Sequence, residues 1–95
     1  MSEGTQGKTV LVIDDNANGR ELVRTVLEKL GYIVHEACDG REGLTAAGNL
    51  LPDLIVLDLH MPGLTGFEVI ERLRQSDALA ATPVLALTAS AMMGV

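Results

Sequence analysis

Three short apolar segments of this sequence each end in a side chain whose oxygen could bind a ligand. Two run into aspartates and the third into a threonine: VLVI (residues 10–13) before Asp14 and Asp15, LIVL (54–57) before Asp58, and VLAL (84–87) before Thr88. Continuous apolar runs of this kind, separated by helix-like stretches, predict buried parallel strands. In a parallel α/β sheet the carboxyl ends of the strands meet at one edge, where ligands bind. Because clustered carboxylates repel each other and hard oxygen ligands suit Mg²⁺, this pattern predicts a magnesium site.

The remaining sequence predicts the elements that would position these side chains. Strands are expected at residues 9–13, 32–37, 54–58 and 84–87, and helices at residues 41–51, at residues 67–74 and between residue 16 and Gly31. Glycine, proline, asparagine and aspartate mark the boundaries between them. This alternation of strand and helix, with right-handed crossovers, predicts a doubly wound α/β fold with a parallel sheet.

The first predicted helix carries two local expectations. Asn18, with Glu21 three residues later, fits the logic of a capping box at the start of a helix. Five apolar residues at helical spacing are expected to line the face that turns toward the sheet: Leu22, Val23, Val26, Leu27 and Leu30.

Composition argues against several classes of protein. With 95 residues, 47% of them hydrophobic, the chain is expected to form one small globular domain. The net charge of −6 and the lack of tryptophan argue against direct binding to nucleic acid or to an anionic membrane. No segment reaches the length of a membrane span, and residues 1–8 are a polar lead-in rather than a signal peptide. The single cysteine, Cys38, suits a reducing cytoplasm, and we expect it to be at least half-buried.

Five motifs together resemble the receiver domain of two-component response regulators. They are VLVIDDN (10–16), Asp39-Gly40, PDLIVLD (52–58), MPGLTG (61–66) and LTA (87–89). The resemblance covers residues 8–95 and implies a flavodoxin-like fold with the strand order 2-1-3-4. It assigns residues 1–8 to a flexible lead-in and residues 9–95 to the receiver domain.

The resemblance implies a chemistry for the predicted acidic site. By similarity, Asp58 accepts a phosphoryl group from a phosphohistidine on a sensor histidine kinase or a histidine phosphotransfer protein. Mg²⁺ would be bound directly by Asp15, through water by Asp14, and by one oxygen of Asp58. The backbone carbonyl of His60 would complete the protein's share of the metal ligands.

The resemblance also implies a switch at the end of the last predicted strand. The hydroxyl of Thr88 would donate to a phosphoryl oxygen, and its rotation would shift the neighbouring loop and helix. The backbone N–H of Ala89 would be a further donor. The protein would then be a cytoplasmic signalling switch that assists its own phosphoryl transfer and hydrolysis, rather than an enzyme with a diffusible substrate.

The sequence departs from the family pattern at its carboxyl end. A full receiver has five strands and five helices, whereas these 95 residues are expected to hold four strands and three helices. The family's lysine and aromatic residue on the fifth strand have no counterpart here, and residues 84–87 would be an exposed apolar edge. Three interpretations stay open: an incompletely recorded chain, a truncated chain, or two copies that pair through the fourth strand. The sequence ends inside a predicted helix, which favours an incompletely recorded or a truncated chain.

Other functions compete with that of a phosphorylated receiver. The main alternative is a non-phosphorylated scaffold or dimerisation module, because the strand-five lysine has no counterpart. A hydrolase of the haloacid-dehalogenase kind would need a second acid two residues after its nucleophile, where this sequence has His60 after Asp58. Flavin binding is disfavoured because no phosphate-cradling loop follows the first strand. Mg²⁺-dependent labelling of Asp58 would favour the receiver, and partner binding retained in an Asp58→Asn variant would favour the scaffold.

Overall fold

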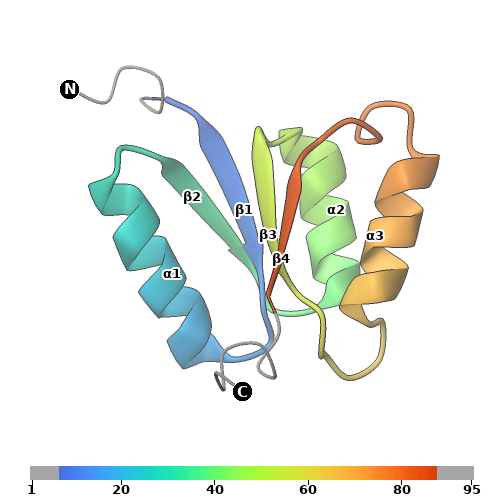
Figure 1. The fold of residues 1–95 in the computed structure, drawn as a ribbon, viewed down its shortest axis with the longest axis horizontal. Helices are drawn as coiled ribbons and strands as arrows, with labels where there is room; N and C mark the ends of the chain where they lie inside the picture. Colours follow the sequence, from blue (N-terminus) through green and yellow to red (C-terminus); the bar gives the residue numbers. More distant parts are fainter. Residues whose placement is uncertain (1–6, 88–95) are drawn as a thin grey trace.

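Strands and helices alternate along the chain in the computed structural model, which describes residues 7–87 (Figure 1). In order they are β1 (Thr9–Ile13), α1 (Ala17–Lys29), β2 (Ile33–Ala37), α2 (Gly40–Leu50), β3 (Leu54–Asp58), α3 (Gly66–Gln75) and β4 (Val84–Leu87). Every end lies within two residues of the position expected from the sequence, which is the usual uncertainty of element boundaries. None of the three helices in the described part of the chain is long and apolar enough to cross a membrane.

The four strands form one parallel sheet with the spatial order β2-β1-β3-β4. At the end of β1, Ile13 pairs with Ala37 of β2 and with Leu57 of β3. Asp58, the last residue of β3, pairs with Leu87 of β4. The carboxyl ends of all four strands therefore meet at one edge of the sheet, the lower edge in Figure 1. The predicted doubly wound fold and strand order are confirmed.

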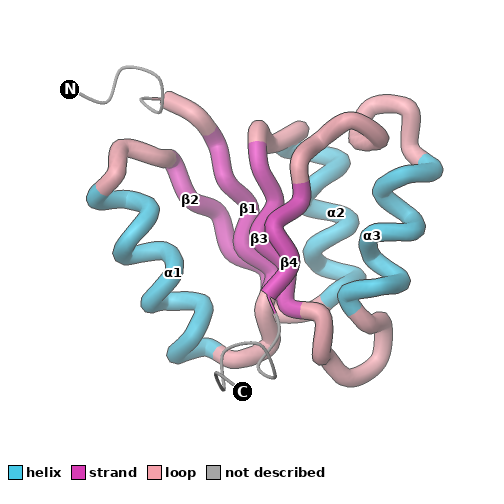
Figure 2. Tube along the Cα trace, in the orientation of Figure 1, coloured by secondary structure: helices cyan, strands magenta, loops and turns pink. Residues whose placement is uncertain are grey.

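Helices cover both faces of the sheet, with α1 on one face and α2 and α3 on the other (Figures 1 and 2). Successive residues of a strand point to opposite faces. In β1, Leu11 and Ile13 join the apolar cluster beneath α2 and α3, and Val10 and Val12 join the cluster beneath α1. All four side chains are buried. Burial on both faces explains why β1 is apolar at every central position rather than at alternate ones.

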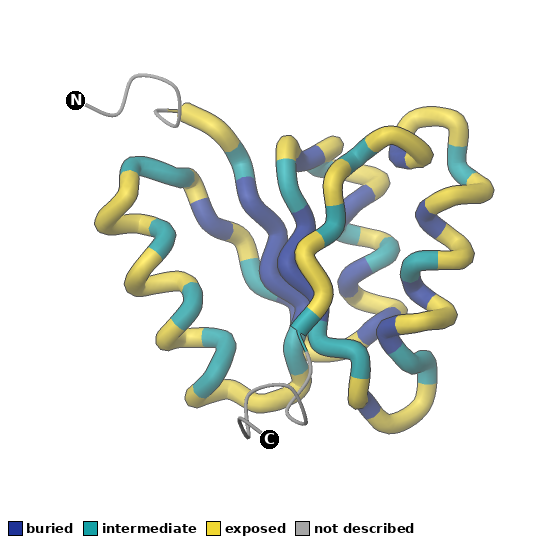
Figure 3. Tube along the Cα trace, viewed as in Figure 1, coloured by how far each residue is buried: buried dark blue, intermediate teal, exposed yellow. Residues whose placement is uncertain are grey.

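Helix α1 buries less of its apolar face than the sequence predicted. Val23 and Leu27, which are four residues apart, pack against the apolar cluster of the sheet. Leu22, Val26 and Leu30 instead keep 66%, 50% and 52% of their surface exposed. No residue of α1 is buried (Figure 3). Residues four positions apart, such as Val23 and Leu27, lie on the same narrow side of a helix. Apolar residues on either side of them face away from the sheet and are not covered by it.

Cys38 is exposed rather than half-buried, which corrects the expectation from the sequence. It lies in the turn between β2 and α2. There the side chain of Asp39 accepts a hydrogen bond from the N–H of Glu42 (2.8 Å) and so caps α2. The Glu42 carboxylate in turn accepts from the N–H of Cys38 (2.7 Å). Cys38 therefore contributes to this turn through its backbone, and its thiol is not packed in the core.

Strand β4 is the outermost strand on its side of the sheet within residues 7–87. Leu85 keeps 54% of its surface exposed, and Ala86 is exposed as well (Figure 3). In the described part of the chain, the fourth strand is thus the apolar edge that the sequence predicted.

We expect a Gly43→Ala substitution to lower the free energy of unfolding by about 1–3 kcal/mol, because it overpacks the contact between α2 and β1. A Cβ at position 43 would lie 2.5 Å from Cδ1 and 2.8 Å from Cγ1 of Ile13, a side chain that is fully buried. Urea unfolding would measure the change.

Gly48→Ala on the same helix is the matched control. A Cβ at position 48 meets nothing within 4 Å, so replacing a helical glycine by alanine there should stabilise the protein by about 0.5–1 kcal/mol. Equal stability of the two variants would contradict the proposed close packing of α2 on β1.

Candidate functional site

The three aspartates singled out in the sequence lie together at the carboxyl edge of the sheet. One carboxylate oxygen from each of Asp14, Asp15 and Asp58 lies within 4.8 Å of the other two. Asp14 and Asp15 follow β1, Asp58 ends β3, and these two strands are neighbours. The parallel sheet therefore brings together carboxylates that are far apart in the sequence, as predicted.

Hydrogen bonds with three partners hold Asp14 in its loop. Its N–H donates to the carbonyl of Ala37 (3.1 Å), which continues the contact between β1 and β2 beyond the last strand residue. The N–H of Asn16 donates to Asp14 Oδ1 (2.9 Å). Arg20 Nη1 donates to the carbonyl oxygen of Asp14 (2.7 Å). Both the backbone and the side chain of Asp14 are therefore held by hydrogen bonds.

Asn16, and not the predicted Asn18, caps helix α1. Asn16 has an extended backbone (φ −91°, ψ 111°), and its side-chain oxygen accepts from the N–H of Gly19 (3.0 Å). Asn18 already lies inside the helix, so the predicted capping box with Glu21 is wrong. Because Asn16 also donates to Asp14, the start of the helix is tied to the acidic cluster.

Gly66 allows the start of α3 to lie against the main chain of Asp58. A Cβ at position 66 would meet the carbonyl oxygen of Asp58 and would lie 2.6 Å from Cα of Leu59, closer than real Cβ atoms come. The N–H of Gly66 also donates to the carbonyl of Leu59 (3.3 Å). A side chain at this position would therefore push apart α3 and the end of β3.

His60 contacts Asp58 through its backbone. The N–H of His60 donates to Asp58 Oδ1 (3.0 Å) and orients that carboxylate from the loop after β3. Asp58 is half-buried, whereas His60 is exposed. The use of the His60 carbonyl as a metal ligand stays a prediction.

The electrostatics of the cluster disfavour three ionised carboxylates. Burial raises the pKa of the Asp14 carboxyl above its ordinary value, and the hydrogen bond from Asn16 opposes this shift. The negative charges of Asp58 and Asp15 raise the pKa of Asp14 further. A bound cation would relieve this repulsion.

The chemistry of the donor set fits Mg²⁺. The cluster offers carboxylate oxygens, which are the hard ligands that Mg²⁺ prefers, and it contains no cysteine or histidine side chain that would favour a softer metal. Asp15 is exposed, so the cluster is open to solvent on one side and leaves room for bound water. Asp14, Asp15 and Asp58 are therefore the residues that could hold such an ion.

Thr88 and Ala89, which the sequence assigned to phosphoryl binding, lie outside the described residues, and their roles stay predictions. The last described residue of β4, Leu87, pairs with Asp58. Its carbonyl also accepts from the N–H of Leu59 (3.0 Å). The end of β4 thus lies directly beside the end of β3.

Arg20 is a residue of the site that sequence reasoning missed. Its side chain is only 18% exposed and contacts both Asp14 and Glu36. Its position in the sequence could have indicated this role. A basic residue in the first turn of a helix that follows a strand lies close to the carboxyl end of that strand. Its partner Glu36 could not be identified from spacing alone.

Comparison with known proteins identifies the family of this chain. The family model described as "Response regulator receiver domain" matches residues 10–95. The chain is 48% identical over 80 residues to the DNA-binding dual master transcriptional regulator RpaA of Synechocystis, a match that covers 84% of this chain and 33% of that protein. It is 38% identical over 87 residues to the polar-differentiation response regulator DivK of Brucella anthropi, covering 92% of this chain and 71% of that protein.

Solved structures show the same architecture. The N-terminal domain of a response regulator receiver protein from Methanoculleus marisnigri JR1 superposes with a TM-score of 0.83 at 40% identity, covering 85% of this chain and 66% of that chain. The chemotaxis protein CheY4 of Vibrio cholerae gives a TM-score of 0.81 at 38% identity, covering 84% and 67%. This chain thus spans about two thirds of these solved structures and a third of the length of RpaA.

We expect an Asp14→Asn substitution to stabilise the metal-free protein at pH 7, because a neutral amide removes one charge from the crowded cluster. The pKa of Asp14 is raised in the folded state, so its ionised form lowers stability above that pKa and has no such effect below the unfolded value of about 4. The advantage of the variant should therefore shrink as the pH falls toward 4. Urea unfolding at several pH values would measure it.

Asp77→Asn is the control for this pH series, because Asp77 is an exposed carboxylate in the connection between α3 and β4. Its unfolding curves should follow those of the wild type at each pH. An Asp14→Asn protein that is less stable than the wild type at pH 7 would contradict the account of repulsion.

Proposed function

The chain belongs to the response regulator receiver domain family, and we propose that Asp58 is the residue on which it is phosphorylated. Receiver domains are signalling switches of two-component systems, and histidine kinases or histidine phosphotransfer proteins phosphorylate them on an aspartate. The observation that carries the proposal is the position of Asp58, which ends β3 within 4.8 Å of carboxylate oxygens of Asp14 and Asp15. The proposed partner is a sensor histidine kinase or a histidine phosphotransfer protein.

The surroundings of Asp58 suit a carboxylate nucleophile. Its Oδ1 accepts from the N–H of His60, so the carboxylate is oriented before a phosphoryl donor arrives. In the transfer, an oxygen of Asp58 forms a bond to phosphorus while the bond from phosphorus to the donor's histidine nitrogen breaks. The remaining obstacle is charge, because a cluster of carboxylates faces an anionic phosphoryl group.

We infer that Asp14, Asp15, Asp58 and the carbonyl of His60 hold Mg²⁺ in this site. Receiver domains generally bind Mg²⁺ at an acidic aspartate cluster, and the donor set of this chain fits such an ion. When bound, Mg²⁺ would supply the charge neutralisation that lets the carboxylate approach the phosphoryl oxygens. The protein's own share is to orient the carboxylates of Asp14 and Asp58 and to hold the main-chain carbonyl of Asp14 through hydrogen bonds.

Thr88 and Ala89 are proposed to bind oxygens of the phosphoryl group, in addition to the proposed Mg²⁺. The register of β4, in which Leu87 pairs with Asp58, supports this assignment because Thr88 and Ala89 follow directly in the sequence. The phosphoryl group on Asp58 would carry nearly two negative charges and several acceptor oxygens. Donation from the Thr88 hydroxyl to one of these oxygens would be the switch that shifts the neighbouring segment.

The proposed unit is a receiver domain of residues 9–95 that follows the lead-in of residues 1–8 and acts in the cytoplasm. It would assist its own phosphoryl transfer and hydrolysis rather than convert a diffusible substrate. RpaA is described as DNA-binding, but the match covers only 33% of that protein. The net charge of −6 supports a receiver that contacts neither nucleic acid nor an anionic membrane by itself.

Incubation with acetyl phosphate and Mg²⁺ should add one phosphoryl group to the wild type and none to Asp58→Asn, which intact-mass spectrometry would measure. The control is Asp53→Asn. Asp53 directly precedes β3, at the opposite end of this strand, and accepts from the N–H of Thr9 (2.8 Å), a bond that the asparagine oxygen can keep. Phosphorylation of Asp58→Asn to the level of the wild type would contradict the proposal.

A second candidate function, a scaffold or dimerisation module, is supported by the apolar edge that β4 forms within residues 7–87. If two copies pair through this strand, sedimentation will show a dimer, and Leu85→Lys will give a monomer because an edge lysine blocks pairing. Ile33→Lys is the control, since Ile33 is 50% exposed on β2 at the other side of the sheet. A monomeric wild type would contradict this candidate and leave the phosphorylation proposal intact.

A further inference from the structure

Arg20 connects the acidic cluster to strand β2. Its Nη1 donates to the carbonyl oxygen of Asp14 (2.7 Å), and its Nε donates to Oε1 of Glu36 (2.8 Å). The side chains of Arg20 and Glu36 are only 18% and 25% exposed. A half-buried guanidinium with two acceptors is held more firmly than an ion pair on the open surface.

The carbonyl that Arg20 binds belongs to the peptide that joins Asp14 to Asp15. A peptide unit is planar, so fixing its carbonyl direction restricts ψ of Asp14 and φ of Asp15 together. The N–H of Asp14 is held separately by the carbonyl of Ala37 (3.1 Å). The peptide units before and after Asp14 are therefore both held by hydrogen bonds. This restricts the directions in which the side chains of Asp14 and Asp15 project from the backbone.

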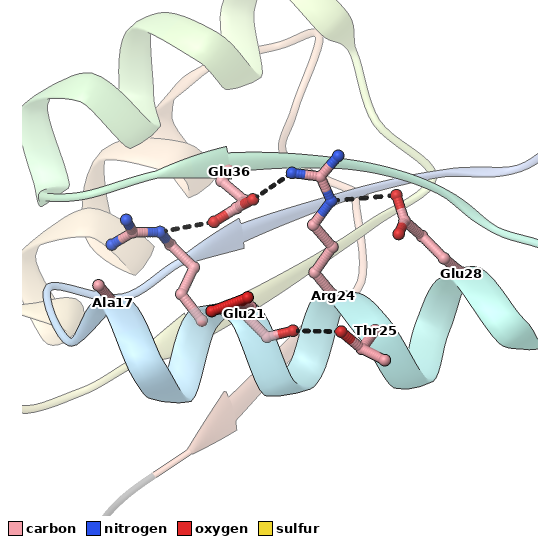
Figure 4. Close-up of a pocket in the computed structure, with 7 residues that line it drawn as sticks. Ala17, Glu21, Arg24, Thr25, Glu28 and Glu36 are labelled. Carbon is pink, nitrogen blue, oxygen red and sulfur yellow. Dashed lines mark hydrogen bonds and ion pairs between the residues drawn. The ribbon is translucent and has the colours of Figure 1, made fainter.

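Glu36 is the anchor for this arrangement. It lies on β2 next to Ala37, and Arg24 Nη1 donates to its second oxygen, Oε2 (2.6 Å). Arg24 also donates to Glu28 one turn further along α1 (3.0 Å), as Figure 4 shows. Hydrogen bonds from Arg24 and Arg20 lower the pKa of the Glu36 carboxyl, so it stays charged at neutral pH.

We propose that Arg20 is a positioning residue for the metal site: it holds the peptide between Asp14 and Asp15 so that both carboxylates converge with Asp58. This inference rests on the proposed binding of Mg²⁺ by these aspartates. Arg20 contributes no ligand to the ion. It acts by limiting the freedom of a loop whose like charges would otherwise drive the carboxylates apart.

The role requires arginine rather than any cation. The guanidinium presents several N–H donors in a rigid fork, so one side chain can hold the carbonyl of Asp14 and the carboxylate of Glu36 together. A lysine has one flexible nitrogen and would keep the charge without the fork. Arg20→Lys therefore separates positioning from electrostatic attraction.

The test is the affinity of the chain for Mg²⁺ alone, measured by NMR titration of the backbone amides of residues 15 and 16. The chain has no tryptophan to report binding by fluorescence. Arg20→Lys should bind Mg²⁺ about tenfold more weakly than the wild type, as expected when a partner that orients metal ligands is lost. Urea unfolding of the same samples would report their stability.

Arg24→Lys is the matched control. Arg24 lies one turn after Arg20 on α1 and contacts the same Glu36, but its side chain donates to Glu36 and Glu28 rather than to Asp14. This variant should lose no more stability than Arg20→Lys, while its affinity for Mg²⁺ stays within about twofold of the wild type. If Arg20 has only a structural role, both variants should lose stability and neither should lose affinity for Mg²⁺.

The outcomes separate this inference from the proposed function. A wild type without any Mg²⁺-dependent shift would overturn both. A wild type that binds Mg²⁺, beside an Arg20→Lys variant that binds it equally well, would overturn only the role of Arg20. Should Arg20→Lys fail to fold, Glu36→Gln decides instead: the weakened anchor should lower the affinity about threefold, and unchanged affinity would overturn the inference.

Discussion

Mutual repulsion among three carboxylates acts at the carboxyl edge of the sheet, and the surrounding backbone is built to resist it. Oxygens of Asp14, Asp15 and Asp58 lie within 4.8 Å of one another. Two like unit charges about 4 Å apart near a protein surface repel by about 4 kcal/mol. Hydrogen bonds from Asn16 and Arg20 hold the end of β1 in this arrangement, which suits a bound cation.

The aliphatic core supplies the frame that offsets this repulsion. In β1 alone, four consecutive side chains, Val10 to Ile13, are at most 1% exposed. Burial of each contributes about 1.5–3 kcal/mol, and this helps the fold to hold the crowded carboxylates together. Glycines also allow close packing of the helices: Gly43 lets α2 pack closely on β1, and Gly66 lets the start of α3 lie against the end of β3. The same strands thus form the core along their length and carry the site residues at their carboxyl ends.

The strands and the acidic cluster could be predicted because they depend on local patterns. A run such as residues 10–13 is apolar throughout only when both faces are covered, and that fixes a parallel strand whose end carries Asp14 and Asp15. Helical spacing in α1, by contrast, marks an apolar side without saying how much of it a sheet can cover, which is why Leu22 is exposed. The contact of Arg20 with Glu36 depends on how α1 lies beside β2, and no sequence spacing encodes that distance.

The most direct test of a cation site at this edge is anomalous X-ray diffraction from crystals of the chain grown with Mn²⁺, which prefers the same oxygen ligands as Mg²⁺. The account predicts an anomalous peak within bonding distance of carboxylate oxygens from Asp14 or Asp15 and from Asp58, with His60 beside it. A peak located elsewhere, or no peak at saturating Mn²⁺, would contradict it. The aspartates would then be a cluster held together by the fold alone.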